Sequence, residues 1–436
     1  MKEIFLIKDT PGNKISYYLL LCFVVALPYD RFYSELFLVF FALHTLLHRK
    51  PRPVFRWNDS PWILAALYLA MVCCSFYSSW FSLALHQWEI QLSLLLLPLL
   101  FWINPIDTSA YRNHWFLGFA LSCLCLVIYL YAYAGAVMFQ NHFPFSRLFD
   151  GSFLNQYFSY PVGTHPTYLA MYCGFSMLVF IQEFRSAHGL LNKSLWLICS
   201  FVCFAGLLQL ASKAVWIALI FILNIVIPAF EKNKRSRRRL IMVFATITMV
   251  TVTFAWLNHG MHARLISQFS GDLDRQALNK TIPEPRILRW QAAWELVEKS
   301  PVFGYGTGSE IPLLKNKYAD HHLLRSLYFE LNTHNQFLAL WINTGLLGLF
   351  IYFLLFVRGG WRASKAKDGL GISFLLILFL VSLSENILGL NKGIFFLSFF
   401  YPLLFSFLPR QVNSKDASFI QQAASNTAHS HPLQGA

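Results

Sequence analysis

Charged residues are scarce in this chain: only 13% of its 436 residues are Asp, Glu, Lys or Arg, whereas a soluble domain carries roughly 25%. Hydrophobic residues make up 56% of the sequence. Apolar runs long enough for a helix to cross a bilayer, about 20 residues each, follow one another almost from end to end. This composition excludes a soluble enzyme and predicts an integral membrane protein.

The chain also lacks a basic face or arm, although its formal net charge is +14. Its Lys and Arg residues fall in short loops between apolar runs. The positive-inside rule predicts that such basic loops are cytoplasmic. We therefore expect contact with membrane lipids and none with nucleic acid. The three basic clusters are Arg49, Lys50, Arg52 and Arg56; Lys232, Lys234, Arg235, Arg237, Arg238 and Arg239; and Arg358, Arg362, Lys365 and Lys367.

Disulfides and zinc sites are not expected either. All eight cysteines lie inside apolar runs, where cysteine behaves as a small hydrophobic residue. The basic N-terminal residues and the apolar stretch after them resemble a signal peptide, but Leu27 to Asp30 offers no small-residue cleavage site. We interpret this stretch as a retained first helix.

The apolar runs predict an all-α polytopic fold with about twelve transmembrane helices. A single helix over 194–230 would be about 55 Å long, nearly twice the thickness of the hydrocarbon core, so the chain must turn near Ser212 and Lys213. Twelve crossings place both termini and all three basic clusters in the cytoplasm. The predicted spans are 15–28, 34–48, 61–82, 91–104, 115–138, 165–184, 194–211, 214–230, 240–257, 336–357, 370–388 and 393–408.

One long hydrophilic insertion, 258–335, lies on the predicted outer side. Loops longer than about 12–15 residues are usually functional or disordered. The aromatic residues of this loop, Trp290 and Trp294 among them, give it apolar surface to bury, so we expect it to fold into short helices. The predicted organisation is a single transmembrane domain over 1–408 that contains this periplasmic loop, and a disordered cytoplasmic tail over 409–436.

Inside the loop, Pro285 opens a predicted helix on which Arg286, Trp290 and Trp294 share a face. This face would hold the guanidinium at the level of the lipid headgroups. The alternative is an amphipathic helix that lies on the membrane with its arginines solvated or in contact with lipid phosphates. The glycines at 304, 306 and 308 imitate a dinucleotide motif, but no strand precedes them, so they predict a turn that reverses the chain.

Four polar residues at the outer ends of apolar runs could carry chemistry. Lys213 is either a topological anchor or a cation for a phosphate. The imidazole of His334 can accept a proton near neutral pH, and Asn335 could orient a sugar or a diphosphate. His165 is a weaker candidate. Glu385, inside the eleventh predicted span, requires an Arg or Lys partner that the sequence does not identify.

Taken together, these pieces resemble the O-antigen ligase and O-antigen polymerase superfamily of bacterial membrane glycosyltransferases. The resemblance rests on their order over about 200–360. Ser212 and Lys213 come first, then Arg286 four residues before Trp290, then Pro301 with the three glycines, and finally His334 and Asn335 with Gly345 and Gly348.

The resemblance implies a GT-C-like enzyme of the bacterial inner membrane with a periplasmic active site. Its members take a glycan from a polyprenyl (undecaprenyl) diphosphate and pass it to an acceptor hydroxyl, here most simply that of lipid A-core. Arg286 would contact the diphosphate and His334 would be catalytic. Lys213 stands where members usually carry a second arginine, and Asn335 and Arg289 would also bind the diphosphate or the glycan.

The implied chemistry needs no metal and no cofactor, because fixed cations can stabilise charge that develops on phosphate oxygens. Three alternatives stay open: a polysaccharide polymerase, a protein O-oligosaccharyltransferase and, from another class, a lipid or polysaccharide transporter.

Overall fold

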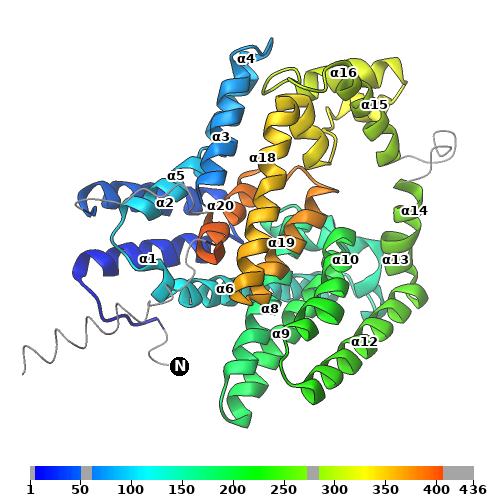
Figure 1. Ribbon diagram of the computed structural model, residues 1–436. Helices are drawn as coiled ribbons and strands as arrows, with labels where there is room; N and C mark the ends of the chain where they lie inside the picture. Colours follow the sequence, from blue (N-terminus) through cyan, green and yellow to red (C-terminus); the bar gives the residue numbers. More distant parts are fainter. Residues whose placement is uncertain (1–4, 51–60, 273–283, 406–436) are drawn as a thin grey trace, which may run out of the picture. The chain divides into compact units, whose positions relative to one another are not determined.

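The computed structural model describes residues 5–50, 61–272 and 284–405. Within these ranges the chain is helical and contains no strand, which confirms the all-α prediction (Figure 1). Residues Arg52 and Arg56 of the first basic cluster and the predicted tail over 409–436 lie outside the described residues.

Every predicted span overlaps helix, but the helix within the eleventh span, 370–388, ends at Ser382, and residues 406–408 of the twelfth lie outside the described residues. The elements are α1 (Pro11–Ala26), α2 (Arg31–Leu47), α3 (Trp62–Ser75), α4 (Phe81–Gln91), α5 (Ser93–Ile103), α6 (Thr108–Gln140), α8 (Pro166–Ser186), α9 (Leu190–Leu210), α10 (Lys213–Phe221), α11 (Ile227–Ala229), α12 (Lys234–Leu257), α18 (Gln336–Ala366), α19 (Gly369–Ser382) and α20 (Asn391–Phe405). Five helices in the described ranges are long and apolar enough to cross a membrane: 81–103, 108–140, 190–210, 234–257 and 336–366. The protein is therefore a membrane protein, and the count of twelve crossings stays a prediction.

The predicted turn near Ser212 and Lys213 is present. Helix α9 ends at Leu210, and Ala211 adopts a left-handed conformation with φ of 43° before α10 begins at Lys213. The rings of Phe204 and Trp216 lie 5.6 Å apart. In a straight helix the twelve residues between their positions would separate them by about 18 Å, so the chain reverses here.

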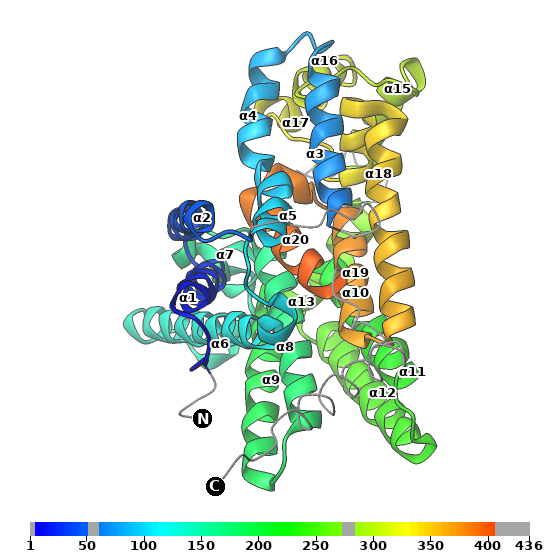
Figure 2. The same cartoon turned by 60° about the vertical axis from the view of Figure 1, so that its left-hand side comes forward.

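The span predicted over 336–357 is not one straight helix, contrary to our expectation. Gly345 interrupts α18 with φ of 60° and ψ of −149°. The rings of Phe337 and Tyr352 approach to 5.5 Å, although 15 residues of straight helix would separate them by about 22 Å. The two halves of α18 therefore pack side by side as a hairpin, which Figure 2 shows.

Glycine is required at this reversal because of a close approach by another segment. A Cβ atom on Gly345 would lie 2.1 Å from the carbonyl oxygen of Val302, and one on Gly304 would lie 2.6 Å from the backbone nitrogen of Gly345. Both residues have positive φ, which glycine adopts without a steric penalty. The segment 300–308 thus forms the predicted glycine turn, and it packs against the tip of the α18 hairpin.

The described part of the outer loop folds into short helices, as predicted: α13 (His259–His262), α14 (Gln268–Asp272), α15 (Arg286–Lys299), α16 (Glu310–Asp320) and α17 (Leu324–Tyr328). Helix α15 packs against α16 and α18 through a cluster that includes Ala293 and Leu296. Within α15, the side chain of Arg289 is 6% exposed and that of Trp294 is 46% exposed. One of the two arginines of this helix is therefore buried in the loop and not solvated.

Candidate functional site

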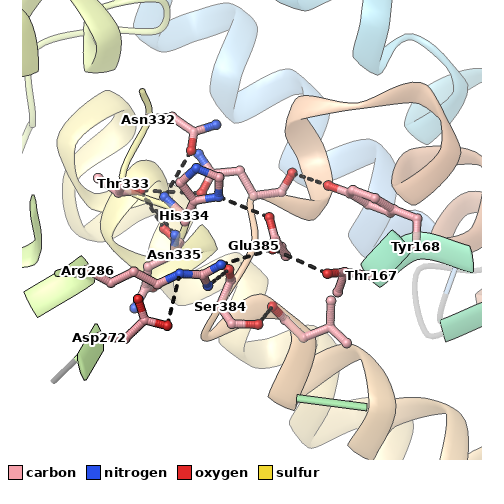
Figure 3. A network of polar contacts seen from close by, with 12 residues as sticks. Thr167, Tyr168, Asp272, Arg286, Asn332, Thr333, His334, Asn335, Ser384 and Glu385 are labelled. Carbon is pink, nitrogen blue, oxygen red and sulfur yellow. Dashed lines mark hydrogen bonds and ion pairs between the residues drawn. The ribbon is translucent and has the colours of Figure 1, made fainter. Parts of the chain in front are cut away.

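Polar side chains from several helix ends meet at one place in the molecule. His334 precedes α18, Glu385 follows α19, and Arg286 begins α15. Figure 3 shows the ring of His334 facing the carboxylate of Glu385, with Arg286 and Asp272 on one side and residues at the start of α8 on the other. Helix ends supply these groups because connecting segments, unlike helix interiors, can turn a side chain toward a shared point.

His334 has a strained backbone. Its φ of 47° lies in the left-handed region, which costs a non-glycine residue on the order of 1–3 kcal/mol. The side chain of Asn332 compensates by accepting a hydrogen bond of 2.9 Å from the amide of His334. Trp290 supports the same segment by donating its indole N–H to the carbonyl of Thr333 at 3.0 Å. The segment is thus held in a conformation that aims the imidazole at Glu385.

The imidazole and the carboxylate form a direct pair. Nδ1 of His334 lies 3.1 Å from Oε2 of Glu385. An ionised carboxylate can only accept, so Nδ1 carries the proton and donates it to Glu385. The lone pair of the imidazole then resides on Nε2, which is the atom that can act as a base. The His334 side chain remains 23% exposed, so a substrate can reach it.

Glu385 is the buried centre of the network. It lies in the connection after α19, and its side chain is 7% exposed. Burial alone would raise the pKa of its carboxyl, but the His334 hydrogen bond and charge interactions with His165, His334 and Arg286 hold the pKa below its usual value. Its Oε1 lies 3.5 Å from Nη2 of Arg286 and accepts from Thr167 at 3.4 Å. The partner that the sequence did not identify is therefore Arg286, together with His334.

Two cations converge on one carboxylate oxygen beside this pair. Oδ2 of Asp272 lies 2.8 Å from Nζ of Lys213 and 3.9 Å from Nε of Arg286. Arg286 also donates from Nη1 to the carbonyl oxygen of Ser384 at 2.6 Å. The side chains of Lys213 and Arg286 are 19% and 26% exposed. This arrangement binds an anionic oxygen and leaves it accessible from outside.

The structure brings Lys213, Arg286 and His334 together. The two remaining predicted residues are Asn335 and Arg289. Asn335 caps α18, since its Oδ1 accepts from the amides of Phe337 and Leu338 at 3.0 and 3.2 Å. Arg289, in α15, is buried, its Nε and Nη1 have no partner among the described residues, and it interacts electrostatically with Arg286 and Asp272. Substrate binding by Asn335 or Arg289 stays a prediction.

Sequence reasoning did not identify three residues of this neighbourhood. Asp272 pairs with both predicted cations, and Arg264 interacts electrostatically with Arg286, Asp272 and Glu385. Glu310, in α16, accepts hydrogen bonds from the amide and the hydroxyl of Thr333. For Asp272 the sequence offers one indication, an acidic residue in the same loop as a predicted cation. It offers none for Arg264 or Glu310.

His165 lies at the start of α8, close enough to interact electrostatically with Glu385, His334 and Arg286. Burial lowers the pKa of His165, so its ring is neutral more readily than that of an exposed histidine. Over the described ranges, no group of three or more His, Cys, Asp or Glu side chains has an arrangement that could hold a metal ion.

The arrangement as a whole pairs a histidine base with an anion site. Nε2 of His334 can take a proton from a hydroxyl group, while Lys213 and Arg286 can neutralise negative charge on a neighbouring oxygen. Residues 198–353 match the family model described as O-antigen ligase, and this match confirms the resemblance drawn from the motifs. The matched range includes Lys213, Arg286 and His334 but ends before Glu385. No curated protein matches the chain.

Proposed function

We propose that this membrane protein, whose residues 198–353 carry the O-antigen ligase family domain, transfers a glycan from a polyprenyl diphosphate carrier to an acceptor hydroxyl, and that the acceptor is lipid A-core. One observation carries the proposal. A histidine oriented by a buried carboxylate lies beside two cations that converge on a single anionic oxygen.

In the proposed reaction, Nε2 of His334 accepts the proton of the acceptor hydroxyl as its oxygen attacks the anomeric carbon. The bond from that carbon to the diphosphate oxygen breaks, and the leaving group takes the electron pair. Arg286 and Lys213 stabilise the charge that develops on the phosphate oxygens. Glu385 keeps the proton of the imidazole on Nδ1 and stabilises the imidazolium that forms.

We further propose that the reaction requires no metal, because two fixed cations can supply the charge stabilisation. The site would face the periplasm of a bacterial inner membrane. In that topology the chain crosses twelve times, both termini are cytoplasmic, and 1–408 form a single domain. The basic loops support this orientation.

The direct test is a transfer assay with purified protein, lipid-linked donor and lipid A-core, with a chelator present. His334→Ala should lower the rate by about 10²–10⁴ because the base is lost. His322→Ala is a matched control, since His322 also has positive φ, 54°, in the same loop but is exposed and outside the network. Full activity of His334→Ala, or loss of wild-type activity with chelator, would contradict the proposal.

A deletion strain separates ligation from polymerisation. Loss of a ligase leaves full-length glycan on the polyprenyl carrier, whereas loss of a polymerase leaves single repeats. If single repeats accumulate, the acceptor is a growing glycan and not lipid A-core.

A further inference from the structure

A cavity lies next to the site, on the other side of the segment that carries His334. It encloses about 250 Å³ between α3, α4, α16, the first half of α18 and the segment after Glu385. This volume is near the lower end of ligand pockets, which range over about 300–1,000 Å³. None of the residues that line it belongs to the cationic group of Lys213, Arg286 and Asp272.

The lining of the cavity is rich in carboxamides, and its titratable side chains are those of His86 and Glu310. Six of its fifteen residues are Asn or Gln, and none is Lys or Arg. A carboxamide both donates and accepts hydrogen bonds, as does each hydroxyl group of a sugar. Apolar side chains, including those of Ile90 and Leu340, complete the wall. Such a surface suits a polyol with apolar ring faces better than it suits a phosphate or a lipid chain.

One lining side chain has an unused polar atom. Gln91, the last residue of α4, is 5% exposed, and its Nε2 donates to the carbonyl oxygen of Leu388 at 2.9 Å. Its Oε1 is buried and accepts no hydrogen bond within the described part of the chain. A buried carbonyl oxygen without a donor is unfavourable, and a hydroxyl group of a ligand would supply the missing hydrogen bond.

The wall of the cavity is shared with the His334 site. Asn332, which accepts from the amide of His334, lines the cavity, and so does Asn386, the neighbour of Glu385. Gln336 fixes the same wall by accepting from the amide of Leu388 at 2.7 Å. A group bound in the cavity would therefore contact the two segments that hold the catalytic pair.

We propose that this cavity binds a neutral saccharide ring and thereby places a glycan beside His334, an inference that rests on the proposed function. The ring belongs either to the donor glycan or to the acceptor. Both are polyhydroxylated, so the chemistry of the cavity is the same for the two sources and the experiment must separate them.

The test measures binding of two lipid-free probes to the purified full-length chain by saturation-transfer NMR. One probe is the oligosaccharide of the lipid A-core, and the other is the O-antigen repeat released from its carrier. Ile90→Trp should fill the cavity and weaken the binding of one probe at least tenfold. Leu85→Trp is the matched control, because Leu85 lies on the same helix but is 45% exposed and does not line the cavity.

A second variant, Gln91→Leu, removes the unused carbonyl and should raise the KM of the same substrate in the transfer assay while leaving the KM of the other unchanged. Loss of core oligosaccharide binding identifies the acceptor, and loss of repeat binding identifies the donor. The inference fails if neither probe binds the wild type, or if Ile90→Trp and Leu85→Trp bind alike. If a probe binds as expected but no transfer occurs, the proposed function fails and the saccharide site stands.

Discussion

Two buried carboxyl groups, Glu310 and Glu385, flank the segment that carries His334, and their surroundings differ in charge. Glu385 pairs with His334 and lies 3.5 Å from Arg286, and its pKa is held below the usual value. Among the described residues, Glu310 accepts only from neutral donors, the amide and hydroxyl of Thr333 and the side-chain amide of Asn386. Burial raises the pKa of Glu310, and these hydrogen bonds oppose the shift without cancelling it.

The difference separates two uses of a buried acid. An ionised carboxylate beside a histidine fixes the tautomer and favours the imidazolium, so Glu385 is suited to chemistry. A carboxyl group that resists ionisation can join segments without adding charge, and Glu310 joins α16 to the connections that precede α18 and follow α19. Charge is therefore concentrated on one side of His334, where the diphosphate is proposed to bind, and is weak on the side of the cavity.

After the loss expected for His334→Ala, the largest effect should come from removing Arg286, the cation that balances Glu385. Arg286→Ala should lower transfer by about 10²–10³, the usual cost of losing a donor that stabilises developing charge. Arg286→Lys should retain only part of the activity, because an ammonium group cannot reproduce the planar fork of guanidinium. Lys213→Arg is the matched control and should be tolerated. The measurement is the transfer rate in membranes, and wild-type activity of Arg286→Ala would remove this residue from the site.

A smaller effect is expected for Glu385→Gln. The amide keeps the shape of the side chain but cannot favour the imidazolium, so kcat should fall by about 10–100-fold with little change in the KM of either substrate. If Glu385 served only to hold the fold, the variant would instead lower the thermal unfolding midpoint and leave the kcat of the folded fraction unchanged. Measuring both quantities on one preparation distinguishes these outcomes.

The helices and one of the two reversals were predictable from the sequence. The turn at Ser212 followed from length alone, since 194–230 could not be one span. The reversal at Gly345 did not, because its flanks are equally apolar and glycine is common within membrane helices. Its cause is a contact with Val302, on a segment more than 40 residues earlier, which no local pattern reveals.

The site was predictable only as separate residues. Motif order selected Lys213, Arg286 and His334, and the structure places them around Asp272 and Glu385. The pairing of His334 with Glu385 joins residues 51 positions apart, so spacing could not indicate it. For Asn335 the sequence permitted two roles. An asparagine before an apolar helix can cap that helix or bind a ligand, and in the structure its side-chain oxygen forms the cap.

Replacing Asp272 should change the KM of the donor only a few-fold, and the direction of the change identifies the role of this residue. Its carboxylate pairs with the two cations that are proposed to bind the diphosphate, so Asp272→Asn should lower the KM of the donor by roughly 2–5-fold, as expected for removal of a partly exposed competing charge. Asp320→Asn is the control, because Asp320 is an exposed acid 3.9 Å from Lys317 and is outside the site. An increase in the KM of the donor would show that Asp272 positions the cations and does not compete for them.

The smallest effect is expected for Glu310→Gln, and it concerns stability. In the unfolded chain this carboxyl titrates near pH 4.5, and burial raises its pKa in the folded protein. Below pH 4.5 both states hold the proton, so the residue contributes equally to each. As the pH rises, the unfolded state loses its proton first, so the wild type loses stability until the pH passes the folded pKa.

Glutamine cannot ionise and mimics the protonated acid, so the variant should unfold about 2–4 °C higher at neutral pH, with a difference that shrinks toward pH 4.5. Thermal unfolding in detergent across this range is the measurement, with the exposed Glu298→Gln as control. A difference that does not change with pH, or a less stable variant at neutral pH, would mean that Glu310 is ionised in the folded protein and that the two carboxyl groups are alike.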